Sequence, residues 1–184
     1  MKYKLKEIFD LHMGKTPSRN NAEYWNSNEY KWISIADLSK TGKYSRDTKE
    51  HLSKQAIDES GIKLIPANTV IMSFKLSIGK TAITAEDMYS NEAIMAFADF
   101  DEKKFNIDFL HFLIANKNWL LGAKQAVKGQ TLNKESIGNA KIIIPPIEMQ
   151  EQFASIYNQA DKSEFELRKS IEAIDQVIKS LINN

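Results

Sequence analysis

The sequence predicts an α+β protein, with one domain of short strands and helices over residues 1–146 and a long coiled-coil-forming helix over residues 147–184. Three observations predict this. Up to Pro146, short apolar runs alternate with Gly, Pro, Asn and Asp residues that favour turns. The strand and helix candidates follow one another without a βαβ repeat of fixed period. From Glu148 to Ile182 there is no Gly or Pro, and apolar residues recur at helical spacing.

The elements of the first region follow from apolar runs and their boundary residues. A short apolar segment over residues 5–11 ends before Gly14 and leads into a polar loop. Ser53 is placed to cap a helix over residues 54–60 that stops at Gly61, and Asn106 is placed to cap the next helix. A further helix is expected over residues 118–127, ahead of Gly129. The predicted strands cover residues 32–35, 69–74, 81–85, 93–98 and 141–144.

The C-terminal segment predicts one helix of about 35 residues, which at 1.5 Å per residue is about 50 Å long. A compact domain of this size does not need such a length. From Leu167 its apolar residues are spaced 4, 3, 4 and 3 apart, as in a heptad, whereas Ser163 and Glu164 interrupt the pattern. The helix could fold onto the chain's own core. The favoured interpretation is pairing with another chain through Phe153, Ile156, Leu167, Ile171, Ile174, Ile178 and Leu181.

Composition excludes several classes of protein but does not identify one. The 42% hydrophobic content supports a folded core, and the absence of Cys excludes disulfides and thiolate metal sites. No run of 18 apolar residues and no apolar leader occur, so we expect a cytoplasmic protein that does not span a membrane. Twenty-five Lys and Arg against 24 Asp and Glu give a net charge of +1, which does not indicate a nucleic-acid-binding protein. A neutral total can still contain a basic face.

The sequence contains no complete catalytic or metal-binding motif. Two Gly-Lys-Thr triplets begin at Gly14 and Gly79, but a phosphate-binding loop needs another Gly five residues earlier, where Phe9 and Phe74 stand. The three His residues are isolated from one another in sequence. We therefore predict no catalytic residue, no metal and no cofactor bound by this chain.

Three polar loops supply the candidate DNA contacts. Arg and Lys can donate to guanine, Asn and Gln can pair with adenine, and Ser suits phosphate. Loops of this kind are also common as ordinary solvated turns. The predicted contacts are Lys15, Ser18, Arg19, Lys75, Ser77, Lys80, Lys128, Gln130 and Asn133.

The order of six motifs along the chain resembles the DNA specificity (S) subunits of type I restriction–modification systems. No single motif is specific, but together they span nearly the whole chain. They are Gly14-Lys15-Thr16-Pro17-Ser18; residues 24–25 with 32–38; residues 65–74 with 77–80; residues 91–94; Gly129-Gln130-Thr131-Leu132-Asn133 with Ile137; and residues 144–152.

The resemblance implies a target-recognition domain over residues 1–146 and a conserved helix over residues 147–184. Such subunits have no catalytic activity. They read one half of a split DNA target and dock a methyltransferase (M) subunit that binds S-adenosylmethionine, while a restriction (R) subunit uses ATP to translocate DNA. The family's usual plan has two recognition domains and two helices, whereas this sequence has one of each. It is either a natural half-subunit, which would homodimerise through the helix, or a truncated chain.

Two other classes of function are left open. The chain could be a helical scaffold or interaction protein without DNA binding. A small nuclease built on Glu102 and Lys104 is the third interpretation, and it lacks the strand-borne Asp that such a site needs.

Overall fold

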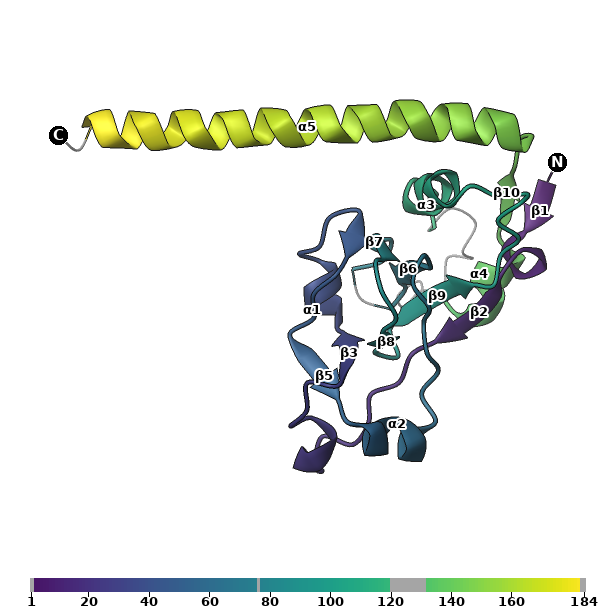
Figure 1. The fold of residues 1–184 in the computed structure, drawn as a ribbon. Coiled ribbons are helices and arrows are strands. Elements are labelled where there is room, and N and C mark those ends of the chain that lie inside the picture. Colours follow the sequence, from purple (N-terminus) through teal and green to yellow (C-terminus); the bar gives the residue numbers. More distant parts are fainter. Residues whose placement is uncertain (1, 76, 120–131, 183–184) are drawn as a thin grey trace, which may run out of the picture.

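The structure is a computed structural model that describes residues 2–75, 77–119 and 132–182, with the backbone alone at 181 and 182. It confirms the predicted α+β class, because short strands and helices form a domain and one long helix follows. Figure 1 shows the domain beside the N-terminal half of this helix, α5 (Ile147–Ile182), whose C-terminal half extends past it.

A five-stranded sheet lies at the centre of the domain, in the order β2-β9-β6-β7-β4. Its strands are β2 (Asp10–Met13), β9 (Ile94–Ala98), β6 (Val70–Ser73), β7 (Thr81–Thr84) and β4 (Tyr44–Ser45). Neighbouring strands are antiparallel, except that β4 runs parallel to β7. Met95 pairs with both Met13 and Met72, and Met72 pairs with Thr81. The ends of β2 and β6 therefore lie beside the beginnings of β9 and β7.

Two smaller sheets complete the strand structure. The three-stranded sheet has the order β5-β3-β8, and the two-stranded sheet pairs β1 with β10. The strands are β1 (Lys2–Lys4), β3 (Tyr30–Ile33), β5 (Glu50–Leu52), β8 (Tyr89–Ser90) and β10 (Lys141–Ile143). Lys2 lies opposite Ile143, so the first strand of the domain closes against its last.

The helices are short apart from α5. They are η1 (Leu5–Glu7), η2 (Ala22–Tyr24), α1 (Ile35–Leu38), α2 (Lys54–Ser60), α3 (Ile107–Ala115) and α4 (Lys134–Asn139). Ser53 caps α2 and Gly61 ends it with a φ of 60°, as the sequence predicts. Asn106 caps α3 by accepting hydrogen bonds from the Asp108 and Phe109 amides, which also confirms the prediction.

The predicted strand over residues 32–35 is wrong at its C-terminal end. Strand β3 ends at Ile33, and Ser34 caps α1 instead of continuing the strand. The Ser34 side chain accepts from the Asp37 amide, and the Asp37 carboxylate accepts from the Ser34 amide at 3.1 Å. This reciprocal pair starts a helix within an apolar run that the sequence pattern alone assigns to a strand. The helix predicted over residues 118–127 lies mostly outside the described residues, and residues 118 and 119 are not helical.

Both faces of the five-stranded sheet are buried, which explains the continuous apolar runs of β6 and β9. Val70 and Met72 point into a cluster that includes Leu110 of α3 and Ile137 of α4. Ile71 lies between them in sequence and points to the opposite cluster, beneath Ile33 and Leu38. Alternation of side chains along the strand thus divides the core into two layers.

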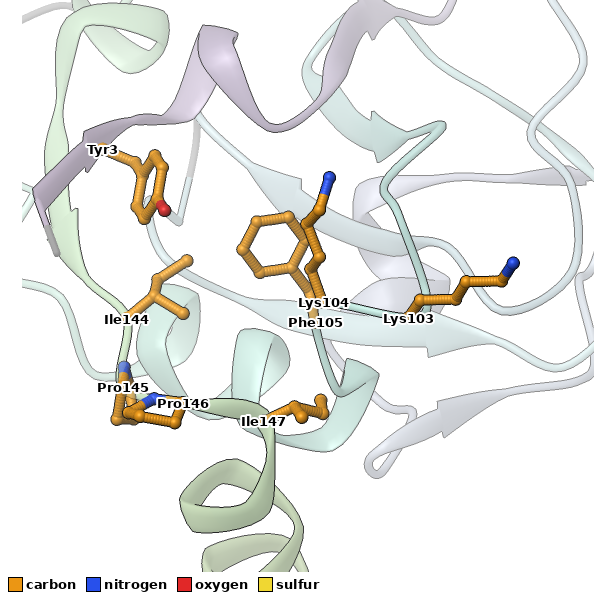
Figure 2. A pocket seen from close by; sticks show the side chains of 8 residues that line it. All are labelled: Tyr3, Lys103, Lys104, Phe105, Ile144, Pro145, Pro146 and Ile147. Atoms are coloured by element: carbon orange, nitrogen blue, oxygen red, sulfur yellow. The ribbon is translucent and has the colours of Figure 1, made fainter.

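The first turns of α5 are anchored to the domain. Gln150 is fully buried. Its side-chain oxygen accepts from the Asn106 amide at 3.0 Å, and its nitrogen donates to the Lys104 and Pro145 carbonyls. Figure 2 shows the adjacent junction, a hollow of about 320 Å³ lined by Tyr3, Lys103, Lys104, Phe105, Ile144, Pro145, Pro146 and Ile147.

A polar cluster fixes α5 about two turns further along. The Lys43 ammonium lies 2.8 Å from the Asp108 carboxylate, and both side chains are largely buried. Asn158 of α5 donates to the other carboxylate oxygen at 2.8 Å, and Tyr44 also donates to Asp108. Nearby, Phe112 of α3 packs against aromatic residues of α5. The direction of α5 relative to the domain is therefore set by specific contacts over its first three turns.

Candidate nucleic-acid interface

One end of the five-stranded sheet gathers the polar loops that the sequence singles out. The loop after β2 contains Lys15, Ser18 and Arg19, and the loop joining β6 to β7 contains Lys75, Ser77 and Lys80. The strand register places these two loops and the segment before β9 at the same ends of the strands. We call this side of the domain the basic end of the sheet.

Gly14 lets the first loop pass close to β8. A Cβ built on Gly14 would stand 1.9 Å from the Ser90 carbonyl oxygen, so no other residue fits without movement of the backbone. The next residue is held at both its amide and its carbonyl: the Lys15 amide donates to the Ser90 carbonyl at 2.9 Å, and the Lys15 carbonyl accepts from the Trp32 indole at 3.0 Å. The Lys15 ammonium donates to the Ser60 carbonyl at the end of α2. The loop backbone is therefore pre-ordered.

Arg19 is fixed by an aromatic ring and a carboxylate. Its guanidinium lies 3.5 Å from the centre of the Trp25 ring and forms a two-pronged pair with Glu50, in which the Nη2–Oε2 distance is 3.1 Å. The Trp25 indole in turn donates to the Ser18 carbonyl at 3.1 Å. These contacts hold the guanidinium in one orientation. Its two terminal nitrogens are engaged by Glu50, so a two-pronged contact with guanine or phosphate would compete with this pair.

Glu92, in the segment before β9, interacts with residues of the loop after β2 and of the β6–β7 loop. The hydrogen bond from Thr16 lowers the pKa of the Glu92 carboxyl, and the positive charges of Lys75 and Arg19 lower it further. Residues from the first loop, the β6–β7 loop and the β8–β9 segment are therefore close in space. This convergence follows from the sheet register and not from proximity in sequence.

The β6–β7 loop is held in shape by Ser73. Its hydroxyl donates to the Ser77 carbonyl at 2.6 Å and accepts from the Lys80 amide at 3.2 Å. Ser77 and Gly79 both have positive φ values, 51° and 88°, which turn the chain tightly. Lys75 and Lys80 flank this turn and are exposed to solvent. The described residues of this loop thus present two cations beside a tight turn.

The opposite end of the sheet carries acidic residues. Asp10 begins β2, Asp99 and Asp101 follow β9, and Asp87 lies beyond the end of β7. Lys63 lies 3.9 Å from Asp10 and Lys104 lies 2.8 Å from Asp101, so cations partly balance the acidic residues at this end. Glu50 and Glu92 likewise reduce the positive charge of the basic end.

The histidines do not form a catalytic or metal-binding group. Burial lowers the pKa of His12 and of His111, so both imidazoles are neutral at neutral pH. His111 lies 3.3 Å from the Thr81 hydroxyl. Across the described part of the chain, no group of three or more His, Cys, Asp or Glu could hold a metal ion. Among the helices described here, none is long and apolar enough to cross a membrane.

A family model described as the type I restriction modification DNA specificity domain matches residues 1–176. The chain belongs to this family. Its relatives include the specificity subunit of the type I restriction enzyme HindI of Haemophilus influenzae, which is 24% identical over 97% of this chain and 40% of the relative. The MjaIX specificity subunit of Methanocaldococcus jannaschii is 23% identical over 98% of this chain and 42% of the relative.

Solved structures share the fold of this DNA specificity domain. A chain from a type I restriction–modification assembly superposes with a TM-score of 0.74 at 17% identity, covering 98% of this chain and 43% of that one. The HsdS subunit from Thermoanaerobacter tengcongensis gives 0.67 at 16% identity, covering 92% of this chain and 39% of the other. The present chain spans about two fifths of the length of these relatives.

The structure brings six of the nine predicted contacts of the DNA specificity domain to the basic end: Lys15, Ser18, Arg19, Lys75, Ser77 and Lys80. Asn133 is not at the basic end. Its side chain accepts from the Ser136 amide at 2.8 Å and caps α4, which packs on η1 and β2. Lys128 and Gln130 lie outside the described residues. None of the nine is tested as a DNA contact, so all remain predictions.

The residues predicted for helix pairing also separate into two groups. Phe153 packs on the domain and not on a free face of the helix. Its ring centre lies 4.5 Å from that of Phe112, so it anchors α5 on α3. The side chain of Leu181 lies outside the described part of the chain. Five others are exposed along α5: Ile156, Leu167, Ile171, Ile174 and Ile178.

Sequence reasoning missed the residues that orient the basic end. Glu50, Trp25 and Glu92 contact or influence predicted cations from distant positions in the chain. The only sequence signal was that Trp25 and Glu92 fall inside the family motifs. No spacing rule connects Arg19 with Glu50, since the contact depends on how β5 packs near the loop.

Proposed function

We propose that this chain is the DNA-reading part of a type I restriction–modification system and has no catalytic activity of its own. The observation that carries the proposal is the convergence of two cation-bearing loops at one end of the sheet. Membership of the DNA specificity domain family supports it. In this proposal the domain reads one half of a split DNA target from the basic end.

The proposed partners follow from the same assignment. A second copy pairs through α5, whose apolar residues are exposed. A methyltransferase subunit docks on the helices and carries S-adenosylmethionine, and a restriction subunit carries ATP, so this chain needs no cofactor. The assembly works on DNA in the cytoplasm.

The salt dependence of DNA binding tests the proposal. Lys75→Ala with Lys80→Ala removes two exposed cations from the basic end. If both ammonium groups contact phosphate, the slope of log K against log salt falls by about 2, since each contact contributes about 0.9. Fluorescence anisotropy with a labelled duplex of mixed sequence measures both affinity and slope.

Lys63→Ala with Lys103→Ala is the matched control, because these exposed cations lie near the opposite end of the sheet. The control should retain the wild-type slope. Equal slopes for the two double variants would contradict the assignment of the basic end. If the wild-type protein fails to bind DNA at low salt, alone and with a methyltransferase subunit, the scaffold function is favoured instead.

A further inference from the structure

Arg19, at the basic end of the sheet, already has an anionic partner within the chain. Its guanidinium donates to the Glu50 carboxylate through both terminal nitrogens, with an Nη2–Oε2 distance of 3.1 Å. A guanidinium binds two oxygens of a phosphate with the same two-pronged geometry. The carboxylate therefore occupies the donors that a DNA phosphate would need.

The position of the guanidinium does not depend on Glu50 alone. Arg19 lies over two tryptophan rings, 3.5 Å from the centre of Trp25 and 5.1 Å from the centre of Trp32. The two rings pack edge to face, with their centroids 5.0 Å apart. Both indoles donate to backbone carbonyls of the loop that carries Arg19. The aromatic pair thus supports the guanidinium, while Glu50 occupies its donor groups.

Glu50 reaches Arg19 from a strand and not from a free loop. It lies opposite Trp32 where β5 pairs with β3, and its carbonyl accepts from the Thr48 hydroxyl at 2.9 Å. The Arg19 side chain is 48% exposed and that of Glu50 is 35% exposed. Water and salt therefore screen their attraction, and an incoming anion can reach the guanidinium.

We propose that Glu50 is a specificity-determining residue, which competes with DNA phosphates for Arg19 and so weakens binding to DNA of arbitrary sequence. The inference rests on the proposed DNA-reading function and adds a control of its basic end. Phosphates are the same at every sequence, so contacts with them do not select a target. A phosphate beside Arg19 is repelled by the Glu50 carboxylate, whereas the acceptor edge of guanine carries no net charge. Glu50 therefore disfavours phosphate contacts more than base contacts.

A second carboxylate strengthens this selection at the same end of the sheet. The Glu92 carboxylate accepts a hydrogen bond from the Thr16 hydroxyl, which lowers the pKa of Glu92. The positive charges of Lys75 and Arg19 lower this pKa further. Glu92 is therefore ionised at neutral pH, and its charge also opposes the approach of a phosphate to Arg19.

Glu50→Gln tests the proposal, since it removes the negative charge and keeps the size of the side chain. We expect the variant to bind a labelled duplex of mixed sequence about tenfold more tightly at low salt. The slope of log K against log salt should steepen by about 0.9, which is the contribution of one new phosphate contact. Fluorescence anisotropy at several salt concentrations measures both quantities.

Glu86→Gln is the matched control. Glu86 is also a partly exposed carboxylate paired with a cation, Lys31, but it follows β7 at the opposite end of the sheet. This control should keep the wild-type affinity and slope. The side chains of Arg19 and Glu50 are both partly exposed, so the variants should fold, and circular dichroism checks this.

An Arg19→Gln background separates competition for the guanidinium from a general effect of charge. Without the guanidinium, Glu50 has no phosphate contact to compete with, so adding Glu50→Gln should change affinity by less than about twofold. An equal gain in both backgrounds would overturn the proposal, because the loss of a negative charge alone would explain it. Weaker DNA binding by Glu50→Gln would also overturn it, because Glu50 would then position Arg19 for DNA.

Failure of this inference is distinguishable from failure of the proposed function. Wild-type protein that binds DNA with a slope dependent on Lys75 and Lys80, and that is unaffected by Glu50→Gln, would retain the basic end as the DNA-binding site. Glu50 would then not be its competitor. If neither wild type nor Glu50→Gln binds DNA at low salt, with or without a methyltransferase subunit, the two proposals are overturned together.

Discussion

At the scale of single residues, Gly14 shows how an absent side chain shapes the basic end. Its backbone passes so close to β8 that a Cβ would stand 1.9 Å from the Ser90 carbonyl oxygen. The close approach allows the Lys15 amide to bond to β8 and directs the loop that carries Arg19. Gly14 belongs to the first of the six motifs that resemble the family, and its close approach to Ser90 explains why a glycine stands there.

We predict that Gly14→Ala destabilises the domain by about 1–3 kcal/mol, because the added methyl group must displace backbone atoms. The measurement is the free energy of unfolding in urea, by circular dichroism. Gly42→Ala is the matched control, since a Cβ at Gly42 meets nothing within 4 Å. Equal losses of stability in the two variants would contradict the role assigned to Gly14.

At the scale of elements, the attachment of α5 depends on a largely buried ion pair. Burial alone would raise the pKa of Asp108, but hydrogen bonds from Lys43 and Asn158 outweigh it and hold the pKa below its usual value. A carboxyl whose pKa is lowered by folding stabilises the protein above its unfolded pKa, and this stability is lost as pH falls through the folded pKa. The attachment should therefore weaken below about pH 4.

Asp108→Asn tests this attachment. It leaves the Lys43 ammonium largely buried without its carboxylate, so we expect a loss of about 3–5 kcal/mol at pH 7. The difference in unfolding free energy between wild type and variant should shrink as the pH is lowered from 5 to 2.5, because the wild-type carboxylate becomes protonated. Urea titrations at a series of pH values measure it. A difference that stays constant with pH would show that the charge of Asp108 is not what stabilises the attachment.

The elements also show what sequence can and cannot predict in this fold. Helices α2 and α3 were predicted because Ser53, Gly61 and Asn106 act within a few residues of their own positions. Strands β4 and β8 have two residues each and are defined by their pairing partners, so no local pattern reveals them. The composition of the basic end was predicted in part from its loops. Its assembly was not, because the approach of Arg19 to Glu50 depends on packing between distant segments.

At the scale of the whole molecule, the half of α5 that extends past the domain exposes apolar side chains. If a second copy pairs with this half, the melting temperature should rise with protein concentration. Ile171→Glu places a carboxylate among the exposed apolar residues of α5 and should give a monomer with a lower melting temperature that no longer rises with concentration. Phe165→Glu is the matched control, because Phe165 is similarly exposed but lies on the other side of the helix. Light scattering and thermal melts at several concentrations measure both. Dissociation by Phe165→Glu, and not by Ile171→Glu, would place the contact on another face.

The pairing of β1 with β10 has a consequence for biosynthesis. Lys2 lies opposite Ile143, so the domain cannot close until residue 143 has left the ribosome. Helix α5 follows directly after β10, so it emerges after the strands of the domain. In the proposed homodimer, each nascent chain would therefore complete its own domain before its helix becomes available to another molecule. This order would favour joining two folded domains over entangling two unfolded ones.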